Sequence, residues 1–460
     1  MPELDSIIDK KKLRKGVYLY IHWPFCRKKC SYCDLNSHVR DSVDQEVWIE
    51  AILSEINYWK ENLPYDFVQT IFFGGGTPSL IKPKYIRKII NHIKSLWEYP
   101  DYLEITLETN PSHLETNSLK EFRDSGINRI SFGVQSLNDE ILESINRTHS
   151  GQEALDHIKE GLQIFNNISV DVMYGLPNQS IEVLEDTLER LISTGIHHIS
   201  IYELTVQKGT LLHFQIKENH LTLPDDDKVF MFYKKIMQIC KKHGFEKYEI
   251  SNFAKKLVVK VCDQKVVLEN NDVDRICEID SEITKSENYN KDIKDKLFSK
   301  DKFLENINSF SGSSNESNKS FCDYRCKHNL AYWTSKPFLG IGPGACSRVE
   351  IDGKLYGLEN SKIPEEWILN VQEKGSSLVD KEHINFEKDF LENIMMGLRN
   401  VDGIDLDELE NRFKSKYESL FNKEKLQQLI NSKYLIIFDK RMKLTESGLM
   451  RYNAVCKYLT

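Results

Sequence analysis

Short apolar runs alternate with helix-length stretches along the first half of the chain. The runs begin near residues 17, 70, 103, 129, 169 and 198. After the first run, apolar residues recur mostly at steps of three or four, the pattern of an amphipathic helix: Val47, Trp48, Ala51, Ile52, Ile56 and Trp59. Repeated strand–helix units predict an α/β fold with a parallel sheet covered by helices. About six units are too few for a closed eight-stranded barrel.

Three cysteines follow the first apolar run, Val17 to Ile21, in a CxxxCxxC spacing: Cys26, Cys30 and Cys33. Iron–sulfur clusters are normally held by four cysteines, so a tight triplet indicates a 4Fe-4S cluster with one iron open to another ligand. A zinc site would need a second CxxC or a histidine pair at finger spacing. A zinc site and a chance group of buried cysteines both remain alternatives, but neither accounts for the preceding strand.

The length and net charge of the chain limit the classes of protein to which it can belong. The 460 residues suffice for two or three domains, and the hydrophobic content of 40% is that of a soluble globular protein. The first residues show no apolar signal region, and no run approaches the roughly 18 apolar residues of a membrane span. Ten cysteines without a paired extracellular framework favour a cytoplasmic location. A net charge of -8 argues against general nucleic-acid binding.

Several motifs in series carry a resemblance to a known family. The segment YIHWPFCRKKCSYCD at residues 20–34 resembles the radical S-adenosylmethionine (SAM) superfamily. Three later motifs resemble the oxygen-independent coproporphyrinogen III oxidase family, most closely its HemW branch of haem chaperones: GGGTPS at 74–79, FGVQS at 132–136 and DVMYGLP at 171–177. The resemblance implies an open, partial (β/α)6 barrel, and barrels of this kind place their chemistry at the C-terminal ends of the strands.

The resemblance and the composition together divide the chain into four parts. We expect a radical SAM barrel over residues 1–254, a low-complexity insert over 255–321, the end of the barrel region over 322–375, and a helical, winged-helix-like domain over 376–460. The insert is rich in Lys, Asp, Glu, Asn and Ser, which bury little apolar area. Residues 257–259 and 266–268 suit a hairpin, and Cys262, Cys277 and Cys322 are not expected to be ligands. For the last domain, the acidic balance and the family favour partner docking or a structural role over DNA binding.

The resemblance also implies site residues. Cys26, Cys30 and Cys33 would hold the cluster, with the amino and carboxylate groups of SAM on the open iron. The glycine run allows backbone amides to approach a ligand, and Gly75, Gly76 and Thr77 match the contact to the methionine end of SAM. Glu108 would accept from the amino group or ribose, with an exposed strand-end acid as the alternative. Tyr20 and Tyr32 flank the thiols, with aromatic core as the alternative for both. Three more positions match contacts to a second SAM in the oxidases, although a buried Arg–Asp pair would give the same pattern: Gln135, Arg147 and Asp171.

The last motif, HNLAYW at 328–333, resembles a haem-binding signature of the HemW branch. His328 would be an axial ligand beside Tyr332 and Trp333, and a hydrogen-bonded core histidine is the alternative. Cys346 stands where relatives commonly carry histidine, which weakens any role carried over to that position.

Two departures from the oxidases favour the chaperone. Cys33 is followed by Asp34 and Leu35 rather than by a further cysteine, and the first strand begins near Val17 without a long preceding segment. We therefore expect a haem chaperone that passes haem to an unidentified acceptor protein and takes electrons from a donor. Oxidase activity is the alternative.

Overall fold

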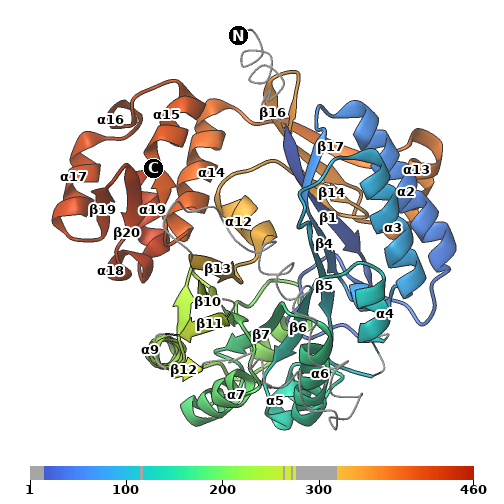
Figure 1. Cartoon of the computed structure of the whole chain (residues 1–460), viewed down its shortest axis with the longest axis horizontal. Coiled ribbons are helices and arrows are strands. Elements are labelled where there is room, and N and C mark those ends of the chain that lie inside the picture. The colour runs from blue at the N-terminus through green and yellow to red at the C-terminus, as the bar shows by residue number, and fades with distance from the viewer. Residues whose placement is uncertain (1–14, 114, 116–117, 263–264, 271–272, 276–318) are drawn as a thin grey trace.

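The computed structural model describes residues 15–113, 115, 118–262, 265–270, 273–275 and 319–460 (Figure 1). Six parallel strands lie side by side in chain order: β1 (Gly16–Trp23), β4 (Phe67–Gly75), β5 (Glu104–Thr109), β6 (Arg129–Gln135), β7 (Ile168–Tyr174) and β8 (His198–Glu203). The connections carry helices along the outer side of this curved sheet: α2 (Gln45–Asn62), α3 (Pro83–Leu96), α4 (Leu119–Asp124), α6 (Gly151–Ile164), α7 (Ile181–Ser193) and α9 (Asp226–Lys242). The prediction of a partial (β/α)6 barrel is confirmed.

Alternation along each strand separates the helix-covered face from the barrel interior. On β6, Ile130, Phe132 and Val134 belong to the main apolar core, whereas Ser131 and Gln135 line an internal cavity. Successive side chains of a strand point to opposite faces, so one strand supplies both the core and the site. The sequence therefore places polar residues inside the barrel without exposing the apolar side of the sheet.

Additional strands extend the sheet at both edges. Strand β10 (Asn252–Cys262) pairs antiparallel with β8, and β14 (Phe338–Ile341) pairs parallel with β1. Beyond β14 the sheet continues antiparallel through β15 (Cys346–Ile351), β16 (Lys354–Asn360) and β17 (Leu378–His383), with α13 (Pro364–Lys374) between the last two. The large sheet thus reaches His383, past residue 375, where the sequence placed the end of the barrel region.

The start of the expected insert forms a β-ribbon. Strand β10 pairs antiparallel with β11 (Lys265–Asn270), with Val259 opposite Leu268, as the predicted hairpin requires. Strand β12 (Val273–Arg275) pairs with β11, and β13 (Lys319–Asp323) pairs with β10. Residues 276–318, which include Cys277, lie outside the described part of the chain, so the prediction for the rest of the insert stays a prediction.

A short helix, α12 (Lys327–Trp333), lies between the concave side of the sheet and the C-terminal region (Figure 1). Its first turn is held by Glu104 on β5, whose carboxylate accepts from the backbone N–H groups of Lys327 and His328 at 3.2 and 3.1 Å. Since Glu104 is the first residue of its strand, α12 occupies the end of the barrel where the strands begin.

The C-terminal region has an apolar core of its own, which includes Ile394, Leu398, Leu435 and Met442. Its helices are α14 (Phe386–Arg399), α15 (Leu406–Phe413), α16 (Tyr417–Leu420), α17 (Lys423–Asn431), α18 (Glu446–Leu449) and α19 (Tyr452–Leu459). They pack with a three-stranded sheet of β18 (Ile404–Asp405), β20 (Arg441–Leu444) and β19 (Leu435–Phe438). Helices followed by a β-hairpin give the predicted winged-helix-like arrangement.

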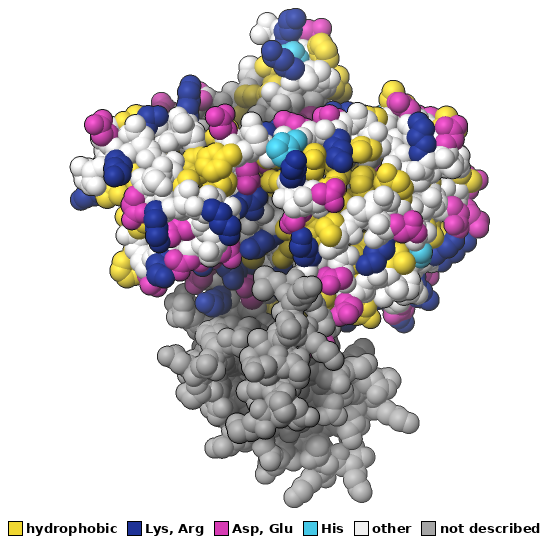
Figure 2. Space-filling view, turned by 90° about the horizontal axis from the view of Figure 1, so that it is seen from above, with side chains coloured by type: hydrophobic (Ala, Val, Ile, Leu, Met, Phe, Trp, Pro, Cys, Tyr) yellow, Lys and Arg dark blue, Asp and Glu magenta, His cyan; other side chains and the backbone are white. Residues whose placement is uncertain are grey.

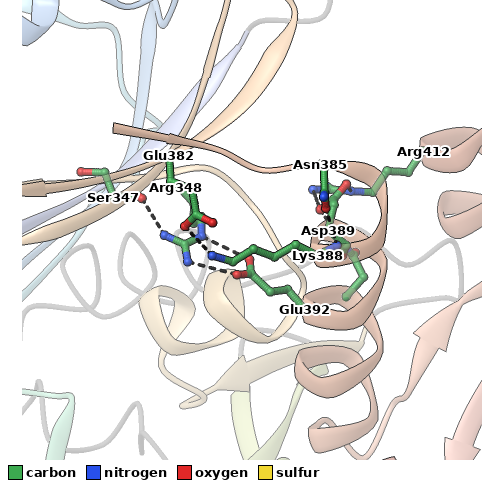
Figure 3. Close-up of polar contacts among 9 residues, drawn as sticks. Ser347, Arg348, Glu382, Asn385, Lys388, Asp389, Glu392 and Arg412 are labelled. Carbon is green, nitrogen blue, oxygen red and sulfur yellow. Dashed lines mark hydrogen bonds and ion pairs between the residues drawn. The ribbon is translucent and has the colours of Figure 1, made fainter. Parts of the chain in front are cut away.

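Ion pairs join this C-terminal region to the extended sheet (Figure 3). Arg348 on β15 donates through Nε and Nη2 to the two carboxylate oxygens of Glu392 on α14, at 3.1 and 3.0 Å. Lys388 on α14 also pairs with Glu382 on β17. On the face seen in Figure 2, basic and acidic side chains are interspersed, without a continuous field of one sign. Among the described residues, no helix is long and apolar enough to cross a membrane.

Candidate functional site

A cavity of about 500 Å³ opens where strands β4 to β7 end. Most of the residues that the sequence singled out line it: Cys26, Cys30, Tyr32, Cys33, Gly75, Gly76, Thr77, Glu108, Gln135, Arg147 and Asp171. The parallel strands bring these separated motifs to one edge of the sheet, as expected for a partial barrel. Tyr20 and His328 do not line this cavity.

The cysteine loop is fixed by its neighbours at several backbone positions. Cys26 ends the short strand β2 (Phe25–Cys26), and its carbonyl oxygen accepts from the N–H of Arg40 at 3.1 Å. The N–H of Ser31 donates to the carbonyl of Ile145 at 3.1 Å, and the Ser31 carbonyl accepts from the N–H of Leu212 at 2.8 Å. Burial raises the pKa of the Cys26 thiol to about 11, so this sulfur is protonated unless a metal displaces the proton.

Three cysteine sulfurs line the cavity, and thiolates are the ligands that an iron–sulfur cluster takes. Among the described residues, no group of three or more His, Cys, Asp or Glu side chains is arranged to hold one ion. Each cysteine of a cubane binds a different iron, so the three sulfurs surround the cluster instead of meeting at one point.

The glycine run presses against the cysteine loop. The N–H of Gly76 donates to the carbonyl of Trp23 at 2.7 Å, and that of Thr77 donates to the carbonyl of Phe25 at 2.9 Å. A Cβ on Gly76 would lie 2.7 Å from the Phe25 oxygen and 3.0 Å from the Cys26 sulfur. Gly75 has φ of +112°, a conformation that favours glycine. The glycines thus allow the end of β4 to lie close to the cysteine loop. This close approach fits the expected cofactor.

Two carboxyl groups form the acidic wall of the cavity. Burial first, and then the nearby Asp171, raise the pKa of Glu108 to about 8, although a hydrogen bond from the backbone of Gly75 acts in the opposite direction. Burial also raises the pKa of Asp171, whose two oxygens each accept from the Ser131 hydroxyl at 3.3 Å. A cation placed beside these groups would stabilise their ionised forms.

Arg147 reaches the cavity from the loop after α5 (Asp139–Ser144). Its Nη1 donates to the Cys30 sulfur at 3.2 Å, and its Nη2 donates to Asn110 Oδ1 at 2.7 Å and to the carbonyl of Gly133. Its buried Nε has no partner. Among the described residues, no ion pair joins Arg147 to Asp171, so the Arg–Asp pair considered from the sequence is not what holds this arginine.

The two tyrosines occupy different environments. Tyr32 lines the cavity and also packs on a small apolar cluster that includes Ile141 and Leu212. Tyr20 lies beneath the cavity, where its hydroxyl is 3.1 Å from His22 Nδ1 and its ring stacks on Phe72. The contacts of Tyr20 are those of the aromatic core alternative.

His328 is buried at the other end of the barrel, with 1% of its surface exposed. Its Nδ1 is 2.6 Å from the Thr70 hydroxyl, and its Nε2 is 2.9 Å from the Tyr332 hydroxyl. Its ring stacks on Phe72, with centroids 5.0 Å apart. Burial lowers its pKa to about 3, and nearby Arg129 contributes. Both nitrogens are therefore engaged within the chain, which matches the core-histidine alternative.

The polar residues of the cavity that were not predicted as ligands include Asn110, Ser131 and Tyr202. Asn110 and Tyr202 stand alone at or near a strand end, without a motif. Ser131 could have been found from the sequence, because alternate residues of a strand lie on the same face. Counting back from Gln135 in steps of two gives Gly133 and then Ser131 on β6.

Comparison with known proteins identifies the class. Residues 20–191 match the Radical SAM superfamily model, and residues 387–451 match the HemN C-terminal domain model. The chain therefore joins a radical SAM domain to a HemN C-terminal domain. Within that class it is similar to HemW along nearly its whole length, as the motifs predicted.

The relatives span bacteria and an animal. "Heme chaperone HemW" of Lactococcus lactis is 26% identical, covering 95% of each chain, and that of Buchnera aphidicola from Schizaphis graminum is 28% identical, covering 96% of this chain and 97% of the relative. "Radical S-adenosyl methionine domain-containing protein 1, mitochondrial" of Danio rerio is 28% identical over 95% of this chain and 85% of the relative. The solved structure of Escherichia coli coproporphyrinogen III oxidase (HemN) has a TM-score of 0.70 at 18% identity, covering 97% and 90% of the two chains, and supports the fold.

Proposed function

We propose that this protein is a haem chaperone that carries a SAM-liganded 4Fe-4S cluster and passes haem to an acceptor protein. One observation carries the cofactor part of the proposal: three cysteines, a glycine run and two carboxyl groups line the same cavity. The HemW relatives, which match nearly the full length, support the chaperone part.

In this proposal the chain's residues divide the work of binding. Cys26, Cys30 and Cys33 hold three irons, and Gly75 to Thr77 with Glu108 receive SAM at the fourth. When bound, the cluster supplies an electron to SAM. Gln135 and Asp171 form the farther wall of the cavity, where a second SAM would lie if this chain follows the oxidases.

The cluster is tested by metal content. Anaerobically reconstituted protein should hold about four irons per chain, and a variant with Cys26, Cys30 and Cys33 all changed to Ala should hold almost none. Cys346→Ser is the matched control, because that thiol is exposed and lies outside the cavity. Adding SAM should change the electron paramagnetic resonance (EPR) spectrum of the reduced cluster. Equal iron in the triple variant, or a spectrum indifferent to SAM, would contradict the assignment.

Haem binding needs its own test, because His328 Nε2 already faces the Tyr332 hydroxyl. Ligation by His328 requires Tyr332 to move away, and the haem-ligand role of this residue stays a proposal. Haem titration followed by absorbance should show one haem per wild-type chain. If His328→Ala binds haem with an unchanged spectrum, His328 is a core residue only; if the variant keeps its cluster but loses haem, α12 rearranges to expose the imidazole.

Coproporphyrinogen III oxidase activity is the second candidate function, supported by the HemN-like fold. The sequence DL after Cys33, where the oxidases carry another cysteine, speaks against it. An anaerobic assay with SAM, a reductant and coproporphyrinogen III separates the two. Conversion to protoporphyrinogen IX without haem binding would reverse the ranking.

Location and partners follow from the same proposal. We propose a reducing compartment, with the cytoplasm as first choice, an electron donor and a haem acceptor, and no nucleic acid. Cell fractionation with a tagged chain tests the location, and recovery in a mitochondrial fraction would replace the cytoplasm with the compartment named for the Danio rerio relative.

A further inference from the structure

Three consecutive residues, numbers 145 to 147, form hydrogen bonds with the cysteine loop. The carbonyl of Ile145 accepts from the N–H of Ser31 at 3.1 Å, and Asn146 Nδ2 donates to the carbonyl of Lys29 at 3.0 Å. Arg147 Nη1 then donates to the sulfur of Cys30 at 3.2 Å. Each of residues 145–147 therefore contacts one residue of the segment 29–31, and the guanidinium contacts the middle cysteine of the triplet.

The backbone holds Arg147 in this position. Asn146 has φ of +67°, a left-handed conformation that reverses the chain after α5, and the N–H of Arg147 donates to the carbonyl of Leu142 at 2.9 Å. At the other end of the side chain, Nη2 is fixed by Asn110 Oδ1 and the carbonyl of Gly133. A planar fork held at both ends presents Nη1 to the sulfur without further loss of side-chain entropy.

The charge of Arg147 is not cancelled by an ion pair among the described residues. Glu115 and Asp171 are nearby acids, but neither forms an ion pair with Arg147 among the described residues. Glu115 Oε2 accepts from Asn110 and from the Thr148 hydroxyl, both at 2.8 Å, and its Oε1 is buried without a partner. His149 is neutral at ordinary pH, because burial and Arg147 lower its pKa to about 3. The guanidinium therefore places a positive charge directly beside the Cys30 sulfur, with Glu115 as a partial counter-charge.

We infer that Arg147 is a positioning residue that raises the reduction potential of the proposed cluster through its hydrogen bond to the Cys30 sulfur. This inference rests on the proposed function, because it requires the cluster. Hydrogen bonds to the sulfurs and nearby charge set cluster potentials, and a cation stabilises the more negative, reduced state. Arg147 would then ease the transfer of an electron to the cluster. A residue that only contacts SAM would leave the potential of the SAM-free cluster unchanged.

Redox titration of the reconstituted full-length protein, monitored by EPR without SAM, measures the potential. Arg147→Gln removes the charge and should make reduction at least tenfold less favourable, which is about 59 mV for one electron. Arg147→Lys keeps the charge but loses the planar guanidinium, so its reduction potential should lie between those of the wild type and Arg147→Gln. Arg27→Gln is the control, since it removes an equal charge beside Cys26 from an exposed position, where water and salt screen it. Its potential should equal that of the wild type.

A second measurement does not depend on the variants. Wild-type protein labelled with ¹⁵N-arginine should show a ¹⁵N coupling in the pulsed EPR spectrum of the reduced cluster, and this coupling should persist in Arg27→Gln. If Arg147→Gln has the same reduction potential as the wild type, the inference is wrong. If Arg147→Gln does not hold iron, the pulsed EPR experiment decides, and absence of the ¹⁵N coupling in the wild type would overturn the inference. Wild-type protein that binds no cluster would instead refute the proposed function.

Discussion

Glu108 illustrates how a single residue couples the cavity to pH. Its pKa of about 8 means that the carboxyl is mostly protonated at pH 7 before a ligand binds. The amino group of SAM would bind the ionised form, so binding must displace a proton. The residue is therefore suited to a cationic ligand and disfavoured without one.

We predict that ionisation of Glu108 contributes about a tenfold gain in SAM affinity between pH 7 and pH 9, read as the difference between the wild-type and Glu108→Gln pH profiles. Glu108→Gln should bind SAM more weakly, and its affinity should lack this part of the pH dependence. Isothermal titration of the cluster-loaded protein measures both. Wild-type and variant affinities with the same pH profile would exclude Glu108 from the site.

The same residue should lower stability. Its folded pKa lies above the ordinary value of 4.5, so the unfolded chain releases the proton first, and the free energy of unfolding falls as pH rises from about 4.5 to about 8. Glu108→Gln should therefore unfold at a higher temperature than the wild type at pH 8 while binding SAM less well. Such a trade-off is typical of groups kept for binding.

His328 makes the opposite contribution. Its pKa of about 3 lies below the ordinary value of 6.5, so its part of the stability is complete above pH 6.5 and is lost as pH falls toward 3. We predict that His328→Ala costs about 3 kcal/mol, because it leaves a cavity and the hydroxyls of Thr70 and Tyr332 without a partner. Urea unfolding at pH 7 measures this cost. The exposed His383→Ala is the control, and equal midpoints for the two variants would contradict the core role.

At the scale of elements, the contact between the end of β4 and the cysteine loop is a steric requirement. Gly76→Ala would place a methyl group 2.7 Å from the Phe25 carbonyl oxygen and 3.0 Å from the Cys26 sulfur, so the backbone or the thiol must shift. Overpacking of this kind costs about 1–3 kcal/mol. We predict that the variant keeps its helical circular dichroism and loses much of its iron.

Gly16→Ala serves as the control for that experiment. The atoms nearest to its added methyl group belong to the side chain of Gln69, which is flexible and can move aside. Its iron content should match that of the wild type. Full iron in Gly76→Ala would show that the close approach of β4 does not matter for cluster binding.

The barrel elements could be predicted because strand and helix periods differ and are repeated. The cysteine triplet, the glycine run and Glu108 could be placed together because each follows a strand of one parallel sheet. The orientation of α12 could not be predicted: His328 and Tyr332 lie four residues apart on one helix face, and the period does not say what that face contacts. Asn110 and Tyr202 escaped because a single polar residue at a strand end has no pattern.

For the whole molecule, the two features of functional interest lie at opposite ends of the barrel interior. The cysteine cavity lies where the strands end, and α12 with His328 lies where β4 and β5 begin. The C-terminal region contacts α12 from outside, where Arg399 on α14 stacks over the ring of Trp333 at 4.5 Å. A change at α12 is therefore more directly coupled to this region than to the cysteine loop.

The seam between the barrel and the C-terminal region contains one fully buried carboxylate. Glu249 has no exposed surface, and it accepts from Arg399 Nε at 2.8 Å. Arg348 and Glu392, by contrast, form a pair whose side chains are 30% and 26% exposed (Figure 3). Removing one partner of a buried pair costs far more than removing one partner of an exposed pair, because a buried charge is left uncompensated.

We predict that Arg399→Met destabilises the protein by about 3 kcal/mol, whereas Arg348→Met costs about 1 kcal/mol or less. Methionine keeps the apolar stem in both variants, so the difference reports the lost charge. Adding Glu249→Gln to Arg399→Met should recover part of the loss, because the buried acid is then neutral. Urea unfolding followed by far-ultraviolet circular dichroism measures each variant. If the double variant is less stable than Arg399→Met alone, the Glu249 carboxylate is held by its other donors, the backbone of Ser251 and the amide of Asn252, and not by the seam.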